Sequence, residues 1–415
     1  MRTFYNLAIL AYGFAIKLCA PFHGKARKFV EGRKLQASIW QEKHPREWGW
    51  FHVSSLGEFE QCKPVISRFK AQFPHLHILL TFFSPSGYEV RHDDPIADLI
   101  CYLPMDTTKN ARNLVECFNL QIACFVKYDF WLNYLSELKK RNIPTILISA
   151  IFRRQQWFFK PWGAFYRSFL SYFDHILVQN IQSRDLLLSI GYQPVEITGD
   201  TRFDRVWAIR EANKPLDMIE SFKNQSQLVV FGSTWPRDHR IIQPVLKRLL
   251  ESGYKIIIAP HEVSDNTIKS LEKDIDQPSH LFSKFDEKAI NDSILIIDQI
   301  GLLSGIYRYA DLAYVGGAFK GTLHNVLEPA VFGIPVLIGR HQNNMKFKEA
   351  SDLIDLGGVF EVESSEELDS QLNLLLNNPK QRIASGDICK TYVENQRGAT
   401  EKTISVMCEL VKRTS

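Results

Sequence analysis

The sequence predicts an α/β protein with two doubly wound domains, each built on a parallel sheet with helices on both faces. The chain has 415 residues, which exceeds the size at which a single hydrophobic core usually stops growing. From Trp48 onwards, short apolar runs of strand length alternate with amphipathic segments of helix length. A polar segment without a strand pattern interrupts this alternation between about Arg205 and Gln227, so we expect two domains joined by a linker.

The composition is that of an ordered globular protein. Hydrophobic residues make up 45% of the chain and charged residues 23%, the usual balance for folded proteins. The net charge of +4 is too weak to indicate nucleic-acid binding, but it permits an anionic substrate or a membrane surface as partner. The 7 cysteines are odd in number and scattered, with no CxxC pair, which favours reduced thiols over disulfides or a zinc site.

Residues 1–35 are predicted to associate with a membrane. Residues 4–22 are apolar except for Asn6 and Lys17, and a basic cluster follows them. A cleaved secretory signal carries its charges before the apolar run, so anchoring fits better. Because the run is marginal for a full span, a short span, an interfacial helix and an amphipathic helix packed on its own domain all remain open. The basic cluster is expected to keep the following domains on the cytoplasmic side.

The first domain is expected over residues 36–205 and the linker over 206–226. Strands of the first domain are predicted in the apolar runs at 50–55, 77–83, 99–104, 122–128, 145–150, 175–180 and 195–199. The second domain is expected over 227–399, with strands in the runs at 228–234, 255–260, 293–298, 312–317, 334–339 and 357–362. Residues 400–415 are expected to form a final helix, free to cross back onto the first domain. In open α/β sheets, ligands bind beyond the carboxyl ends of the strands, so residues directly after each strand are the candidates.

The loop after the first strand contains Ser55, Gly57 and Glu58. Gly57 is expected to permit a tight turn, and Glu58 falls at a helix N-terminus, where free backbone amides favour a carboxylate. Two interpretations of Glu58 remain open. It is either an ordinary first-turn helix acid, or a base that faces the cleft between the domains and takes a proton from an incoming hydroxyl.

Two further loops of the first domain carry polar side chains after a strand. Ser84 and Ser86 follow the second strand, and this loop suits either sugar and phosphate oxygens or a plain helix N-cap. Lys127, Asp129 and Asn133 crowd a helix start after the fourth strand, beside Trp131. Trp131 fits a core position, whereas the spacing of Lys127 and Asp129 favours a site.

In the second domain, Ser233 and Thr234 lie at a strand-to-helix turn, whose free amides can bind an anion. The turn lacks the GxxxxGK[ST] spacing of a nucleoside-triphosphate loop, and no strand is followed by GxGxxG, which argues against a dinucleotide oxidoreductase. Gly316 and Gly317 follow a later strand and are expected to let the backbone approach a ligand.

The segment after these glycines completes the candidate donor site. Asn325 is expected at or near the N-terminus of the next helix, beside a phosphate. Glu328 is expected about one turn into that helix, where its carboxylate can accept hydrogen bonds from paired ribose hydroxyls.

Taken together, these motifs resemble the 3-deoxy-D-manno-octulosonic acid (Kdo) transferases of bacterial lipopolysaccharide assembly. The matching pieces occur in order along nearly the whole chain: VSSLGE, TFFSPSG, YLPMD, FW with Asn133, VQN, GDTRFD, GSTW, YVGGAF and HNVLEPA. The resemblance implies a GT-B fold, with two Rossmann-like domains facing across a cleft, and no metal or cofactor. It implies inverting transfer of Kdo from CMP-Kdo to a lipid A precursor, lipid IVA, on the cytoplasmic side of the bacterial inner membrane.

The resemblance also assigns roles. A sugar hydroxyl is a poor nucleophile, so a carboxylate must take its proton, and the family pattern gives this role to Glu58. Candidates on the acceptor side are Ser55, Gly57, Ser84, Ser86, Asp129 and Asn133. Candidates on the CMP side are Ser233, Thr234, His261, Gly316, Gly317, Lys320, Asn325 and Glu328. Helix N-termini and cations would stabilise the charge that develops on the departing CMP.

Two positions depart from the family pattern. Lys127 stands where the family has the first acid of Glu-Thr-Glu-Leu-Trp-Pro-Asn, while the second acid is kept as Asp129. His261 replaces the arginine of Pro-Arg-His, a loss for which Arg202 or Lys320 can compensate. A GT-B transferase that uses a UDP-sugar, and a catalytically silent lipid-binding relative, remain the alternative functions.

A basic and aromatic segment, FRRQQWFFKPWGAFYR at 152–167, is expected to meet lipid headgroups or acyl chains. Its cations are Arg153, Arg154 and Lys160, and its aromatic side chains include Trp157, Phe158, Phe159, Trp162 and Phe165. The alternative is a surface helix packed within the first domain.

Overall fold

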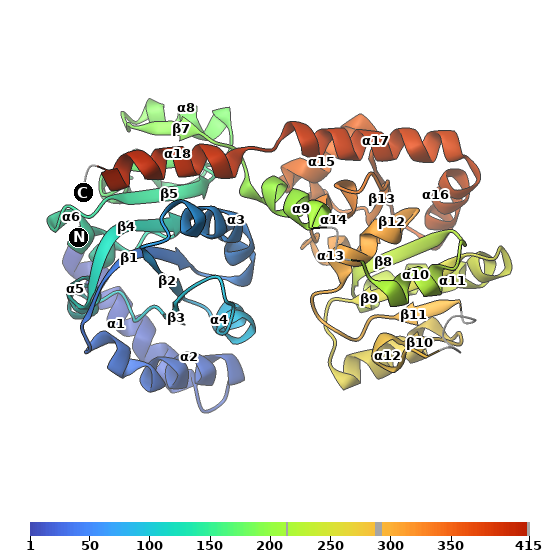
Figure 1. Cartoon of the computed structure of the whole chain (residues 1–415), viewed down its shortest axis with the longest axis horizontal. Coiled ribbons are helices and arrows are strands. Elements are labelled where there is room, and N and C mark those ends of the chain that lie inside the picture. The colour runs from blue at the N-terminus through green and yellow to red at the C-terminus, as the bar shows by residue number, and fades with distance from the viewer. Residues whose placement is uncertain (213–214, 287–292, 413–415) are drawn as a thin grey trace. The chain divides into compact units, whose positions relative to one another are not determined.

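The computed structural model describes residues 1–212, 215–286 and 293–412. The chain divides into two compact units, Met1–Arg205 with Arg397–Ser415, and Val206–Gln396 (Figure 1). Each unit contains a 7-stranded sheet, and the strand pairs are parallel. The predicted fold class, two doubly wound α/β domains, is therefore confirmed.

The sheet of the first unit has the order β3-β2-β1-β4-β5-β6-β7. Its strands are β1 (His44–Val53), β2 (His77–Phe82), β3 (Leu99–Tyr102), β4 (Phe118–Val126), β5 (Thr145–Ala150), β6 (His175–Val178) and β7 (Val195–Ile197). The chain runs outward from β1 to β3 and then returns to pair β4 with β1. This reversal is the topological switch point at which α/β sheets bind ligands, and it brings the loops after β1 and β4 side by side.

Helices cover both faces of this sheet. The helices of this unit are α1 (Arg2–Cys19), α2 (Gly24–Leu35), α3 (Leu56–Gln72), α4 (Pro85–Arg91), α5 (Thr108–Cys117), α6 (Leu132–Lys140), α7 (Ala164–Leu170), α8 (Ile181–Ser189) and α18 (Ala399–Lys412), with 3-10 turns η1 (Ala37–Trp40) and η2 (Trp157–Phe159). α9 (Thr201–Glu211) begins in this unit and ends in the second. Successive residues of β1 point to opposite faces. Trp50 therefore packs edge-on against Tyr134 in one core, and Phe51 packs against Phe69 in the other.

The last helix, α18, belongs to the first unit (Figure 1). It packs on α3 and β4 and adds Ile404, Met407 and Leu410 to the core on that face of the sheet. The Asp204 carboxylate accepts hydrogen bonds from the backbone N–H groups of Gly398 and Thr400. These bonds satisfy amides at the start of α18, which otherwise lack partners at a helix N-terminus.

The sheet of the second unit has the order β10-β11-β9-β8-β12-β13-β14. Its strands are β8 (Leu228–Thr234), β9 (Lys255–Pro260), β10 (His280–Leu281), β11 (Ile294–Ile296), β12 (Leu312–Val315), β13 (Val336–Gly339) and β14 (Val359–Val362). Here the switch point lies between β8 and β12. The strand β10 was not predicted, because a strand of 2 residues leaves no readable pattern.

The segment expected as a linker is partly helical and belongs to the second unit. The helices of this unit are α10 (Asp217–Lys223), α11 (Pro236–Glu251), α12 (Asp265–Ile275), α13 (Leu303–Ile306), α14 (Leu327–Ala330), α15 (Lys348–Leu356), α16 (Ser365–Asn377) and α17 (Pro379–Asn395), with 3-10 turns η3 (Phe282–Lys284), η4 (Tyr307–Tyr309), η5 (Ala318–Lys320) and η6 (Gln342–Lys346). The described residues of 206–226 form no strand, as expected, but they contain the end of α9 and all of α10. Burial of Ile219 and Phe222 holds α10 on the unit.

The N-terminal helices lie on the first unit at an angle to each other. Within the described chain, no single helix is long and apolar enough to cross a membrane; α1 and α2 pass that test as a pair, bent by 115° at their junction. α1 has no buried residue. Its exposed apolar side chains are Phe4, Leu7, Leu10, Phe14 and Leu18.

Polar contacts hold α1 on the unit. The Tyr5 hydroxyl donates to the Asp106 carboxylate over 2.6 Å, and Asn133 donates to the Asn6 side chain over 2.8 Å. The Tyr5 ring also meets the Phe169 ring edge-on. α1 is thus attached through one side, while Phe4, Leu7, Leu10, Phe14 and Leu18 remain largely exposed.

Candidate active site

Glu58 lies in the first turn of α3 and takes part in a capping box with Ser55. The Ser55 hydroxyl accepts a hydrogen bond from the Glu58 backbone N–H, and Glu58 Oε2 accepts from the backbone N–H groups of Ser54 (2.6 Å) and Ser55 (3.1 Å). This arrangement satisfies amides at the helix start. Glu58 Oε1 makes no hydrogen bond to any described residue. The two interpretations of Glu58 are therefore compatible, since one oxygen caps the helix and the other is available.

Burial and neighbouring polar groups have opposite effects on the pKa of Glu58. Burial is the largest effect and raises the pKa of Glu58 above its usual range, although the Ser54 amide and the Lys127 ammonium act in the opposite direction. Lys127 lies directly after β4 with a left-handed backbone, φ 57°, which turns the chain at the sheet edge. The cation at the position where the family pattern has an acid therefore favours the ionised form of Glu58.

The role expected for Gly57 is wrong. Gly57 lies inside the first turn of α3, exposed, with no positive φ and with nothing within 4 Å of the position of a Cβ. The chain turns instead at Ser55, whose extended backbone, φ -144° and ψ 169°, is usual for an N-cap. No tight turn requires a glycine at this position.

Asp129 is the second acid of the first-unit site. It is buried, and Ser54 Oγ donates to its Oδ1 over 2.5 Å, while Oδ2 has no hydrogen-bond partner among the described residues. Burial, and then the charge of Glu58, raise the pKa of Asp129 well above its usual range. Two neighbouring carboxylates ionise one at a time, and because the pKa of Asp129 is raised more strongly than that of Glu58, the pair favours the charge on Glu58 and the proton on Asp129.

His52 and Trp131 support this pair. Trp131 Nε1–H donates to His52 Nε2 over 3.0 Å, so His52 Nδ1–H donates to Thr81 Oγ1 over 2.8 Å. Burial lowers the pKa of His52 to about 3, so the ring is neutral. His52 Nε2 lies 3.8 Å from Asp129 Oδ2. Because Trp131 donates to this same nitrogen, Trp131 belongs to the wall of the site as well as to the core. Its proximity to His52 is a tertiary contact that the sequence does not indicate.

The serine loop after β2 lies next to the same site. The Ser84 backbone N–H donates to the Ser54 carbonyl over 3.0 Å. The Ser84 hydroxyl accepts from the Ser86 amide and caps α4, and the two hydroxyls lie 2.9 Å apart. The plain N-cap interpretation therefore accounts for Ser84, while Ser86 remains exposed at the surface.

Asn133 lies in a different network, around Asp106. Asn133 is buried, and its side-chain amide donates to the Asp106 carbonyl and to Asn6. The Asp106 carboxylate accepts from the backbone N–H groups of Asn133 and Tyr134 at the start of α6, and from Tyr5. Asn133 thus positions α1 and is not in contact with Glu58. Asp106 ends the YLPMD motif but was given no role in the site, although its place soon after β3 was a usable signal.

In the second unit, the loops after β8 and β12 are packed into each other. Asp238 accepts hydrogen bonds from the backbone of Trp235 and Gly317, and from the Tyr314 hydroxyl. A Cβ at Gly316 would lie 2.5 Å from the Ser233 carbonyl oxygen, and a Cβ at Gly317 would lie 2.6 Å from the Thr322 carbonyl oxygen. These glycines are therefore required by the packing of the loops themselves.

Ser233 and Thr234 end β8 in this packed region. Ser233 has a left-handed backbone, φ 53°, which redirects the chain before α11. The Thr234 hydroxyl is buried and lies 2.9 Å from His239 Nε2. Thr234 therefore supports α11 from inside, whereas Ser233 is partly exposed.

An aromatic stack lies where the loops after β8, β9 and β12 meet. We use this name for Trp235, His261 and His324 together with Lys320. The Trp235 and His261 rings stack at 4.7 Å, the two histidine rings stack at 4.3 Å, and the Lys320 ammonium lies 3.2 Å from the centre of the Trp235 ring. Trp235 Nε1–H also donates to His324 Nε2 over 3.1 Å.

The histidines of the aromatic stack are neutral. Burial, then His261 and Lys320, lower the pKa of His324 to about 4. Burial also lowers the pKa of His261. The replacement of the family's arginine by His261 therefore removes a positive charge, and Lys320 is the cation of the stack. Arg202 is paired with Asp200 in the first unit, at 2.7 Å.

Asn325 and Glu328 lie at the start of α14. The Asn325 side-chain oxygen accepts a hydrogen bond from the Leu327 backbone N–H, so Asn325 lies near a helix N-terminus as expected. Glu328 is the second residue of α14, and its expected place one turn into the helix is wrong, because the helix begins only at Leu327. The Ser304 hydroxyl donates to Glu328 Oε2 over 2.9 Å, which shows that this carboxylate is positioned to accept from a hydroxyl.

Comparison with known proteins agrees with these motifs. Residues 28–205 match the family model described as 3-deoxy-D-manno-octulosonic-acid transferase (kdotransferase). The 3-deoxy-D-manno-octulosonic acid transferase of Chlamydophila psittaci is 27% identical, over 97% of this chain and 95% of that protein. The enzyme of the same name from Haemophilus influenzae is 25% identical, over 89% of this chain and 88% of that protein.

Solved structures share the fold at low sequence identity. UDP-GlcNAc 2-epimerase from Neisseria meningitidis superposes with a TM-score of 0.61 at 15% identity, covering 88% of this chain and 99% of that one. MurG from Acinetobacter baumannii has a TM-score of 0.52 at 12% identity, covering 88% and 100%. These likenesses show the two-domain GT-B fold alone. The sequence relatives go further, because they show that this chain is similar to 3-deoxy-D-manno-octulosonic acid transferases over most of its length, and the family model matches residues 28–205.

Proposed function

We propose that the protein transfers Kdo from CMP-Kdo to lipid IVA, with inversion at the anomeric carbon and without a metal. The observation that carries this proposal is the Glu58 carboxylate, with Oε2 fixed by two backbone amides and Oε1 available. A base held in this way can meet an acceptor hydroxyl in one orientation, and general base catalysis depends on such geometry.

In the proposed reaction, Glu58 Oε1 takes the proton of the acceptor hydroxyl while its oxygen attacks the anomeric carbon of Kdo. The bond from that carbon to the CMP phosphate oxygen breaks, and its electron pair leaves with CMP. Attack on the face opposite the leaving group gives inversion. Protonated Asp129 and cationic Lys127 keep the negative charge on Glu58, which is the form that acts as a base.

On the donor side, the charge that develops on the CMP phosphate requires a positive group or free amides. Lys320 in the aromatic stack supplies a cation, and the amides near Asn325 supply donors. Glu328 already accepts a hydrogen bond from a hydroxyl, Ser304, and would accept in the same way from the ribose.

The test compares Glu58→Gln with Glu58→Ala. Glutamine keeps an oxygen for the Ser54 and Ser55 amides but cannot act as a base, so we expect a rate loss of about 100-fold to 10,000-fold with little change in Tm. Alanine removes the cap as well and costs a further ~1 kcal/mol of stability. Transfer is followed by mass spectrometry of the lipid after incubation with CMP-Kdo and lipid IVA.

Two outcomes would reject the proposal. Wild-type protein that gives no Kdo-bearing lipid, yet is stabilised by a UDP-sugar rather than by CMP, would indicate a different donor. Full activity in Glu58→Gln would exclude Glu58 as the base. Loss of activity in both variants with an unchanged affinity for CMP supports it.

We also propose that the catalytic units act on the cytoplasmic face of the inner membrane. The exposed apolar side chains of α1, together with exposed Trp157 and Trp162, support this location. In the segment at 152–167, Arg153 and Arg154 are exposed while Phe158 is buried, so only part of that segment is free to meet lipid. Unchanged partition into anionic vesicles after charge reversal of Arg153 and Arg154 would remove this segment from the proposed membrane surface.

A further inference from the structure

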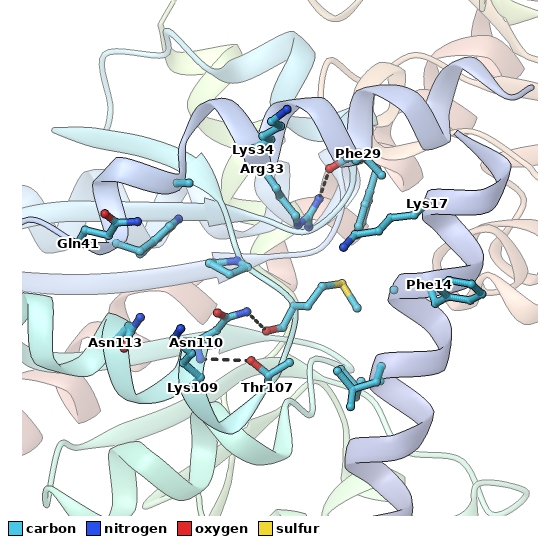
Figure 2. Close-up of a pocket in the computed structure, with 18 residues that line it drawn as sticks. Phe14, Lys17, Phe29, Arg33, Lys34, Gln41, Thr107, Lys109, Asn110 and Asn113 are labelled. Atoms are coloured by element: carbon cyan, nitrogen blue, oxygen red, sulfur yellow. Dashed lines mark hydrogen bonds between the residues drawn. The ribbon is translucent and has the colours of Figure 1, made fainter. Parts of the chain in front are cut away.

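A cavity of about 760 Å³ lies between α1, α2 and the loop after β3 (Figure 2). Its apolar lining includes Ile9, Leu10 and Phe14 of α1, Phe29 and Val30 of α2, and Met105. Cavities of this size, apolar with a few polar groups, are typical of small-molecule sites. Since the outer wall is α1, which buries none of its residues, the cavity is open to whatever surrounds that helix.

The charges around the cavity are all of one sign. Its charged lining residues are Lys17, Arg33, Lys34 and Lys109. Figure 2 shows the Lys17 side chain extending from α1 into the space between the two helices. Lys17, Lys34 and Lys109 are exposed, and none has an ion-pair or hydrogen-bond partner within the described part of the chain. Long basic side chains with apolar stems suit the boundary between an apolar chain and an anionic head group.

Arg33 connects the cavity to the loops of the first-unit site. Its guanidinium donates to the carbonyl oxygens of Leu103, after β3, and Phe83, after β2. The Phe83 ring packs on Trp131 at 4.5 Å, and a smaller hollow of about 280 Å³, also lined by Phe29, reaches Ser84. The cavity is therefore next to the loops that hold Ser54 and Glu58.

We propose that this cavity binds one acyl chain of the anionic lipid acceptor, with the phosphate of that lipid held by the unpaired lysines at the rim. The inference rests on the proposed function for the identity of the lipid. The site itself is defined by chemistry alone, because a largely apolar cavity whose charged lining residues are all cations matches a phosphate-bearing acyl lipid. α1 is then a wall of the acceptor site as well as a membrane contact.

Gly13→Leu tests the cavity by filling it. A Cβ at Gly13 would meet only Met105, at 3.6 Å or more, and leucine is a better helix former than glycine, so the variant is expected to fold. The matched control is Ala15→Leu, which adds a leucine on the same helix at an exposed position outside the cavity. A second pair tests charge: Lys17→Glu lines the cavity, and Arg27→Glu, on α2, does not.

The binding measurement uses the full chain and dodecyl phosphate, added below its micelle concentration and followed by tryptophan fluorescence. We expect Gly13→Leu and Lys17→Glu to weaken binding at least tenfold and the two controls to leave it unchanged. Dodecyl maltoside, with the same chain but no charge, is expected to bind more weakly. Equal binding by Gly13→Leu and wild type, or full competition by inorganic phosphate, would overturn the proposal.

A kinetic measurement distinguishes the acceptor from a lipid of the bilayer. If the cavity holds the acceptor chain, Gly13→Leu raises KM for lipid IVA at least tenfold and leaves KM for the de-acylated disaccharide unchanged. An equal change for both acceptors would mean that a bilayer lipid occupies the cavity, and would overturn the assignment. A wild-type protein without transferase activity would reject the proposed function, while the dodecyl phosphate result would still decide on the site.

Discussion

Replacing Tyr5 with phenylalanine tests how α1 is held on the first unit. The substitution removes one hydroxyl, which donates to the Asp106 carboxylate over 2.6 Å, and keeps the ring that packs against Phe169. The same carboxylate also accepts from the backbone N–H groups of Asn133 and Tyr134. Because α1 buries no residue of its own, polar and ring contacts hold it on the unit, and this hydrogen bond is the shortest of its polar contacts, beside the bonds from Arg2 to Asn133 and from Asn133 to Asn6.

The magnitude depends on the ionisation of Asp106. Burial raises the pKa of Asp106 from 3.8 to about 6, against the opposing effect of its hydrogen bonds. Above pH 6 the Tyr5 hydroxyl donates to a charged group, and its loss costs ~1.5–3 kcal/mol; below pH 5 the carboxyl is neutral, and the loss costs ~0.5–1.5 kcal/mol. Opening of α1 should therefore increase about 10-fold to 100-fold at pH 8, and less at pH 5.

The sign of the pH effect in the wild type follows from the same pKa. A carboxyl whose pKa is higher in the folded state stabilises the fold fully below its unfolded pKa, and this stability is lost as pH rises through the folded pKa. For Asp106 the window is about pH 4 to 6, and the change amounts to about 3 kcal/mol. Tyr5→Phe removes a hydrogen-bond donor to the ionised Asp106 carboxylate, so the variant should lose more stability than the wild type as the pH rises.

Hydrogen exchange of peptides from residues 2–19, corrected for intrinsic rates at pH 5 and pH 8, measures the effect. Tyr12→Phe is the control, because Tyr12 lies on the same helix and its hydroxyl has no hydrogen-bond partner among the described residues. Equal protection of Tyr5→Phe and wild type at pH 8 would refute the reasoning. A larger effect at pH 5 than at pH 8 would refute the assignment of charge to Asp106.

Two further predictions concern the catalytic and donor sites. Lys127→Met removes a charge that lowers the pKa of Glu58, so the acid limb of the pH profile of kcat/KM should move to higher pH; an unchanged limb would mean that Lys127 does not act on the base. Gly316→Ala places a Cβ 2.5 Å from the Ser233 carbonyl oxygen and 2.8 Å from Thr234 Cα. It should cost ~1–3 kcal/mol and weaken CMP binding in calorimetry, and wild-type Tm and affinity would contradict the packing argument.

The fold could be predicted because buried parallel strands leave continuous apolar runs in the sequence. The runs LVVFGST and KIIIAP became β8 and β9 with the predicted bounds. β10 escaped because it has only 2 residues. The helices within 206–226 escaped because the segment is mostly polar, and only Ile219 and Phe222 anchor α10. Short elements that are held by tertiary packing are too short to show a hydrophobic periodicity in the sequence.

Site residues could be predicted only where their position in the sequence relative to a strand determines their place in the fold. Glu58 and Asp129 lie in the segments that follow the paired strands β1 and β4, so their proximity follows from the strand order. The bond from Trp131 to His52 could not be predicted, since 79 residues separate the two side chains. Gly57 was misinterpreted because a glycine before a helix usually indicates a turn, whereas the extended backbone of Ser55 makes the turn here.

Lys127 gives the departure from the family pattern a physical consequence. The charge on Glu58 raises the pKa of Asp129. Repulsion between like charges is mutual, so an ionised acid near Glu58 also raises the pKa of Glu58. A third acid after β4 would add to that repulsion and favour protonated Glu58, which cannot accept a proton. A lysine at that position lowers the pKa of Glu58 instead. The two acids and one cation therefore favour a single ionised carboxylate, on Glu58, and the lysine in place of an acid supports the proposed role of Glu58 as the base.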